Sequence, residues 1–135
     1  MTLIEVLIAA LILGVVTVIF GTALPMASLT SAVVSEDTFA TTVARQKMEQ
    51  IKGLRFENLD YERLLDRNVI DSAPQDAPYG FTNIDNLQQA LRDAQGEIDI
   101  QAIETGVKQI RVTILWTDAR ANPRSVSLVS QTTEQ

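Results

Sequence analysis

The chain has 135 residues, of which 46% are hydrophobic, and it carries a net charge of −6 with neither cysteine nor histidine. The two missing residue types exclude Ser–His and Cys–His nucleophiles and zinc sites built from those ligands. Because no nucleophile with an oxyanion site accompanies the acidic residues, we expect no enzyme, no cofactor and no metal site. The acidic balance also argues against a nucleic-acid surface.

Residues 1–25 form an apolar segment whose one formal charge is that of Glu5. No charged residue occurs between Glu5 and Glu36, and residues 6–24 are a run of 19 apolar, small or hydroxyl-bearing residues. As a helix rising about 1.5 Å per residue, this run is long enough to cross the hydrocarbon core of a membrane. We therefore predict a transmembrane or filament-core helix over residues 1–25.

Three residues are expected to bend or unwind this helix: Gly14, Gly21 and Pro25. Glycine lowers helix stability, and a proline has no N–H for the carbonyl four residues earlier. We predict the bend near residues 21–25.

The helical pattern continues over residues 26–56, now with one apolar side. Apolar residues recur at spacings of three, four and seven, which is typical of an amphipathic helix. These residues are Leu29, Val33, Ala40, Ala44, Met48 and Ile51, and the opposite side is expected to hold Glu36, Asp37, Arg45, Lys47 and Lys52. We predict one spine helix of roughly fifty residues, whose second half packs through its apolar side against another surface.

Residues 57–96 are interpreted as a variable connecting region. A short helix is expected at about 60–68, followed by a loop over 71–82 that contains two prolines and a glycine. Asp85 is expected to cap a second short helix that ends before Gly96.

Residues 97–135 change to a period of two, which is typical of half-buried strands. The alternating apolar residues are Ile98, Ile100, Ile110, Val112, Ile114, Trp116, Val126 and Leu128. We predict three or four antiparallel strands whose buried face is covered by the amphipathic helix. The predicted fold is therefore α+β: a long N-terminal spine helix packed on a small antiparallel β-sheet.

Glu5 is the most informative single residue. An acidic side chain at the centre of a bilayer costs about 3 kcal/mol, and in a packed helical bundle it needs a partner. A free α-amino group at Met1 is one helical turn away within the chain, and Met1 of a neighbouring copy would fix the axial register of an assembly. The alternative is that Glu5 simply lies at the headgroup boundary.

The segment MTLIEVLIAA, from Met1 to Ala10, resembles the mature N-terminus of type IV pilins and type II secretion pseudopilins. In that pattern the first residue is often Phe or Met, the second is Thr or Ser, the next two are aliphatic, and the fifth is glutamate. The match extends over about 25 residues. The resemblance implies cleavage by a prepilin peptidase just before Met1, N-methylation of Met1, and a register and recruitment role for Glu5. Gly14 and Pro25 lie near the family's helix-melting stretch, although the family's proline usually comes a few positions earlier.

The resemblance implies a structural subunit of an extracellular pilus-like filament. Its implied partners are further copies of itself, other pilins and an assembly platform in the bacterial inner membrane, where the subunit is held as a single-pass protein. The alternative within the family is a minor pilin or pseudopilin that primes a secretion or DNA-uptake machine; Met at the first position and a tryptophan in a late strand are similar to I-type pseudopilins. Two further alternatives are a secretory signal peptide and a plain membrane anchor for an unrelated monomeric binding domain.

Two groups of polar residues are weaker candidates. Asp71, Asp76, Asp118 and Asn122 are the residue types that calcium prefers, but their spacing does not resemble a calcium loop, so we expect solvated turn residues. Arg111, Arg120 and Arg124 are candidates for contact with DNA or with an acidic neighbour, and we expect them instead to solvate an edge strand. Trp116 is expected in the core, with a subunit interface as the alternative.

Overall fold

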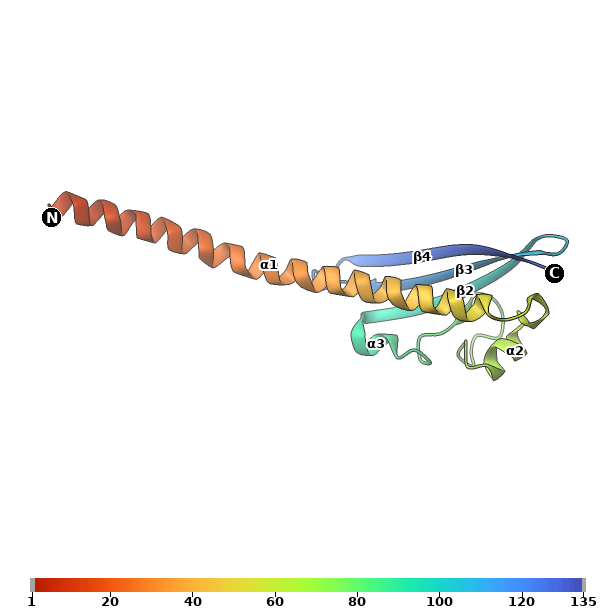
Figure 1. The fold of residues 1–135 in the computed structure, drawn as a ribbon. Coiled ribbons are helices and arrows are strands. Elements are labelled where there is room, and N and C mark those ends of the chain that lie inside the picture. Colours follow the sequence, from red (N-terminus) through yellow and green to blue (C-terminus); the bar gives the residue numbers. More distant parts are fainter. Residues whose placement is uncertain (1, 135) are drawn as a thin grey trace.

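The computed structural model describes residues 2–134, together with their side chains except those of residues 22–25. Its main feature is helix α1 (Leu3–Lys52), a rod of 50 residues whose N-terminal half extends away from the rest of the chain (Figure 1). All other elements gather along its second half. The predicted spine helix is therefore confirmed in length and position.

The C-terminal elements form a four-stranded antiparallel sheet in the order β1-β2-β3-β4. Its strands are β1 (Tyr79–Gly80), β2 (Arg92–Glu104), β3 (Val107–Thr117) and β4 (Pro123–Thr133). A tight turn at Gly106, with φ +78°, joins β2 to β3, and glycine adopts this left-handed conformation at little cost. The predicted α+β arrangement of a long helix on a small antiparallel sheet is confirmed.

The core lies between the second half of α1 and the inner face of the sheet. Small side chains, Ala40 and Ala44, are fully buried and allow the helix backbone to lie close to the strands, and Met48 and Ile51 continue the contact. From the sheet, five of the eight residues predicted to face inward are buried: Ile98, Ile110, Val112, Ile114 and Trp116. The other three, Ile100, Val126 and Leu128, are partly buried and pack against this core. Trp116 is 4% exposed, which confirms its place in the core.

The connecting region between α1 and β2 contains short elements. They are a 3-10 turn (Phe56–Asn58), α2 (Tyr61–Asp66), β1 and α3 (Leu87–Ala90). The predicted helix at about 60–68 corresponds to α2, but the two-residue strand β1 within the predicted loop was not predicted, because so short a strand leaves no alternation in the sequence.

Two predictions for the end of this region are wrong. The N-cap of α3 is Asn86, in a left-handed conformation, and not Asp85. Gly96 does not follow a helix but lies inside β2, which begins at Arg92. It is placed there by packing, since a Cβ at Gly96 would lie 2.6 Å from the ring of Phe81. A side chain at this position would force the Phe81 ring to shift.

Candidate functional site

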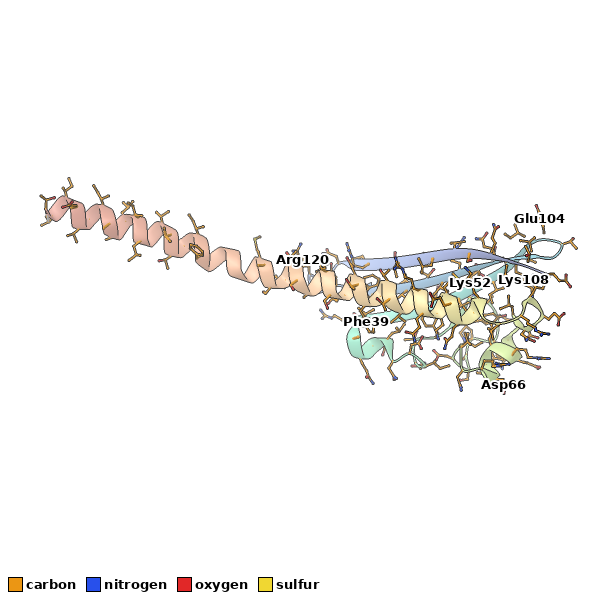
Figure 2. The ribbon with its side chains drawn as sticks, viewed as in Figure 1. Phe39, Lys52, Asp66, Glu104, Lys108 and Arg120 are labelled. Carbon is orange, nitrogen blue, oxygen red and sulfur yellow. The ribbon has the colours of Figure 1, made fainter. Side chains whose placement is uncertain are left out.

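The N-terminal half of α1 presents an uncovered apolar surface. Its large apolar side chains, from Leu3 to Phe20, are 41–80% exposed. Within the described part of the chain, α1 is the one helix that is long and apolar enough to cross a membrane. Apolar surface of this extent requires cover by lipid or by other protein. Figure 2 shows these side chains projecting around the helix rather than on one side of it.

Glu5 lies in the first turn of α1 and has a partner within its own helix terminus. Its Oε2 accepts a hydrogen bond of 3.2 Å from the backbone N–H of Thr2, the N-cap residue. A carboxylate at this position also interacts favourably with the positive end of the helix dipole. Met1, which the sequence pairs with Glu5, lies outside the described residues, so that pairing stays a prediction.

The residues expected to bend the helix do not interrupt it here. The helix runs without a break across Gly14, Gly21 and Pro25, and the side chain of Pro25 lies outside the described residues. A Cβ at Gly14 or Gly21 would meet nothing within 4 Å, so packing within this one chain does not require glycine at either position. The bend expected near residues 21–25 stays a prediction.

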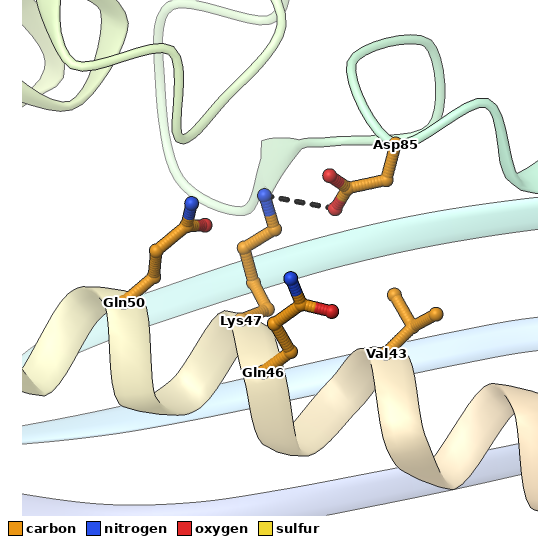
Figure 3. Close-up of a pocket in the computed structure, with 5 residues that line it drawn as sticks. All are labelled: Val43, Gln46, Lys47, Gln50 and Asp85. Atoms are coloured by element: carbon orange, nitrogen blue, oxygen red, sulfur yellow. Dashed lines mark ion pairs between the residues drawn. The ribbon is translucent and has the colours of Figure 1, made fainter.

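Lys47 anchors α1 to the connecting region, and its predicted place on the polar side of the helix is wrong. Its side chain is 2% exposed, and its Nζ lies 2.8 Å from Oδ2 of Asp85 (Figure 3). The same Nζ donates a hydrogen bond of 3.1 Å to the carbonyl of Val69 and lies 5.1 Å from the centroid of the Phe81 ring. A single cation thus joins the helix to three separate points of the connecting region.

A small cavity of about 90 Å³ lies beside this anchor. Its walls are Val43, Gln46, Lys47, Gln50 and Asp85, and the view in Figure 3 shows that the four helix residues lie opposite Asp85. Oδ2 of Asp85 and Nζ of Lys47 form an ion pair at the edge of this cavity. The cavity is too small for an organic ligand, and the anchor is structural.

The turn between β3 and β4 grips α1 where the helix leaves the sheet. We call this contact the hairpin clasp; it joins Ala119, Arg120 and Arg124 to Glu36, Thr30 and Asp37. The amide N of Ala119 donates to Oε2 of Glu36 at 3.2 Å, and Nη2 of Arg120 donates to Oγ1 of Thr30 at 2.7 Å. Arg124 forms a bidentate ion pair with Asp37, with Nε 3.3 Å from Oδ1. The hydrogen bond to Asp37 raises the pKa of the Arg124 guanidinium.

Asp118 shapes the turn of the clasp. Its Oδ1 accepts backbone hydrogen bonds of 2.9 Å from Arg120 and from Asn122, which closes the turn on itself. The bond from the backbone of Asn122 is the main cause that holds the pKa of Asp118 below its usual range. Asp118 is therefore a buried turn-forming residue, not the solvated one that the sequence predicted.

Asp71, another of the four loop residues expected to be solvated, is likewise used in hydrogen bonds within the chain. Asp71 is 8% exposed, and its carboxylate accepts hydrogen bonds from the backbone amides of Asn83 and Ile84 at 3.0 and 2.9 Å. These bonds tie the loop that follows α2 to the turn that precedes α3. Among the residues that the structure describes, no group of three potential metal ligands comes together.

The three arginines of the sequence prediction do not form one surface. Arg120 and Arg124 belong to the clasp, whereas Arg111 lies on the outer face of the sheet, opposite Asp99 in the register of β2 and β3. Arg111 is also in a central strand rather than an edge strand, which corrects that expectation. The three arginines are therefore divided between the clasp and the outer face of the sheet.

The arrangement defines a class of protein: a small α+β domain with a long helix whose apolar half projects beyond the domain and is able to span a membrane. No family model, curated protein or solved structure matches the chain.

Proposed function

We propose that the chain is a pilin-like subunit, held in a membrane by the first half of α1 and then assembled through it into a filament. The observation that carries the proposal is the apolar half-helix from Leu3 to Phe20, uncovered all round, on a helix whose second half is packed on a folded domain. The sheet domain therefore lies at the C-terminal end of α1. In a bundle of the apolar half-helices, the sheet domains would lie on the outside of the bundle.

Apolar surface alone does not favour a filament over a membrane, because lipid covers it equally well. Between helices in lipid, the association energy comes from close packing and from polar groups that find partners. The half-helix offers small residues for close approach, among them Ala9, Ala10 and Gly14, all of which are exposed. Many such contacts repeated along a fibre give a stable assembly although each contact is modest.

Glu5 supplies the polar group that selects the register. It is the one charged residue of the first 35, and burial among apolar helices leaves its carboxylate without water. Its bond with the Thr2 amide occupies one acceptor position, and a carboxylate has about four. An α-amino group of a neighbouring helix is a suitable further partner, and only one axial offset between helices brings the two groups together.

The test is incorporation of a Glu5→Ala variant of the full chain into fibres or cross-linked oligomers. We expect membrane insertion to stay at the level of the unchanged chain, since removing an acidic residue does not lower hydrophobicity. Incorporation is expected to fall at least about tenfold, because a mismatched register leaves small residues out of contact. Glu49→Ala is the matched control, as Glu49 is an exposed acidic residue in the packed half of the same helix.

Normal fibre numbers from the Glu5→Ala variant would contradict the register role. An unrelated membrane helix in place of residues 1–25 separates the filament proposal from a monomeric anchored domain. We expect this exchange to abolish function, whereas a simple anchor would tolerate it. The number of copies per fibre then distinguishes a major subunit from a minor pilin or pseudopilin that primes assembly.

A further inference from the structure

Arg120 is a cation whose side-chain partner within this chain is neutral. Its Nη2 donates a hydrogen bond of 2.7 Å to Oγ1 of Thr30, and among the described residues no carboxylate lies within 4.0 Å of its guanidinium. Arg124, on the same hairpin, is instead neutralised by Asp37. A guanidinium has several N–H donors in a planar fork, so one hydrogen bond leaves most of the fork of Arg120 open to a further acceptor.

The side chain of Arg120 reaches toward the apolar half-helix. The amide N of Ala119 donates to Glu36, whereas the guanidinium of the next residue, Arg120, is bound to Thr30. These two points on α1 are six residues apart, which is about 9 Å along the helix axis. Figure 2 accordingly shows Arg120 at the end of the sheet domain nearest the apolar half-helix.

The level of Thr30 in a membrane follows from the position of Glu5. If Glu5 marks one boundary of a hydrocarbon core about 30 Å thick, a rise of about 1.5 Å per residue places the other boundary near Pro25. Thr30 then lies about 7 Å beyond the core, and a helix tilt of about 20° lowers this to about 5 Å. The headgroup layer of one leaflet is about 5–8 Å thick, so the guanidinium on Thr30 lies at the level of the lipid phosphates.

The acidic residues of the clasp do not oppose an anion at this level. Glu36 and Asp37 follow Thr30 on α1 by six and seven residues, so they are about 9–10 Å further from the hydrocarbon core and beyond the headgroup layer. Asp118, in the turn itself, is 3% exposed, and its Oδ1 accepts two backbone hydrogen bonds within the turn. Its carboxylate is therefore already used inside the chain.

The charges at the start of β2 offset each other. Arg92 lies opposite Thr117, three residues before Arg120 on the chain, and its Nε is 4.0 Å from Oδ2 of Asp93. This pair adds no net charge beside the turn. Of the cations that the described residues bring to this end of the sheet domain, Arg120 is thus the one without an acidic partner.

We propose that Arg120 binds the phosphate of a lipid headgroup in the leaflet from which α1 emerges. A guanidinium pairs with a phosphate through two parallel, charge-assisted hydrogen bonds. Thr30 positions the group, since its hydroxyl donates to the carbonyl of Met26 at 2.9 Å and accepts from Arg120. The contact holds the sheet domain on the membrane surface; it rests on the membrane-held state proposed above and not on assembly into a filament.

The test measures proximity between arginine nitrogen and lipid phosphorus. The full chain, with isotope-labelled nitrogen in its arginine side chains, is inserted into vesicles of phosphatidylcholine and phosphatidylglycerol. Solid-state NMR then records the dipolar dephasing of the guanidinium signal by phosphorus. We expect dephasing in the unchanged chain, and Arg120→Gln should remove at least about half of it, because hydrogen-bonded pairs have the shortest nitrogen–phosphorus distances.

Arg67→Gln is the matched control. Arg67 is exposed, as Arg120 is, but it follows α2, at the other end of the sheet domain (Figure 1). Its replacement should leave the dephasing unchanged. The emission of Trp116, which lies in the core, checks that both variants keep the sheet domain folded. Dephasing that Arg120→Gln does not lower, or that Arg67→Gln lowers equally, would overturn the proposal.

Membrane insertion separates this inference from the proposed function, and resistance to extraction by alkaline carbonate measures it. If the chain resists extraction while Arg120→Gln leaves the dephasing unchanged, the lipid contact is overturned and the membrane-held subunit stands. If the chain is extracted, both are overturned. If an inserted chain shows no dephasing but Arg120→Gln yields fewer fibres, Arg120 contacts a protein neighbour in the assembly, and the lipid contact is again overturned.

Discussion

The Lys47–Asp85 anchor makes an asymmetric prediction about stability. Asp85→Asn removes the anion and leaves an ammonium group that is 2% exposed, whereas Lys47→Met removes the cation and leaves a carboxylate that is 27% exposed. Water can solvate the second leftover charge better than the first. We therefore expect Asp85→Asn to be the more destabilising change, although both remove the same ion pair.

The magnitudes follow from this exposure. Removing one partner of a fully buried pair costs about 3–5 kcal/mol, so Asp85→Asn is expected to lose about 3 kcal/mol, since the Val69 carbonyl and the Phe81 ring still face the cation. Lys47→Met keeps the apolar stem and leaves a partly hydrated carboxylate, so about 1–2 kcal/mol is expected. The double variant should lose at least about 1 kcal/mol less than the sum of the two, because neither charge is then left alone.

The assay is urea unfolding of the full chain in detergent micelles, followed by fluorescence. Trp116 is the one tryptophan and is 4% exposed in the core, so its emission reports unfolding of the sheet domain without a label. Asn86→Ala, next to the anchor, is the control for a general effect on the α3 turn. The reasoning is refuted if Lys47→Met costs as much as Asp85→Asn, or if the double variant equals the sum.

Three smaller predictions use the same assay. Gly96→Ala places a methyl group against the ring of Phe81 and should destabilise the domain by about 1–3 kcal/mol; an unchanged midpoint would show that the ring moves freely. The pKa of Asp118 is lower in the folded chain than in the unfolded chain, so its carboxylate stabilises the fold above the ordinary aspartate pKa of about 3.9. This stabilisation is lost as the pH falls through the lower pKa of the folded chain. Asp118→Ala should therefore flatten the acid limb of a curve of stability against pH. Arg124→Ala should shift the midpoint only slightly at low salt and not at all in high salt, because the pair with Asp37 is exposed; a large shift at both would contradict this.

Much of the fold could be predicted from local patterns. The long apolar run and the alternation over residues 97–135 are periodic signals, and the structure confirms both the helix and the antiparallel strands. The ends of the strands could not be predicted, because β2 begins at Arg92, five residues before its alternation is visible. What starts β2 there is its pairing with β3, where Arg92 lies opposite Thr117.

Lys47 shows why the anchor was missed. By residue type Lys47 is polar, which predicts a place on the solvent-exposed side of the helix. By position, however, it lies three residues after Ala44 and four before Ile51, both fully buried, so its place on the stripe was visible in the spacing. Its partners, Val69, Phe81 and Asp85, are 22 to 38 residues away in the sequence, and no local pattern indicates them.

The hairpin clasp determines where the molecule gives way when it is pulled. Strands β3 and β4 run alongside α1, so tension applied to the free half of the helix loads the contacts in shear, many at a time rather than one after another (Figure 1). The first contacts to bear this force are those of Arg120 with Thr30 and of Ala119 with Glu36, at the point where the helix leaves the sheet. Under tension, stretching would therefore concentrate in the helix before Thr30, while the sheet domain keeps its shape.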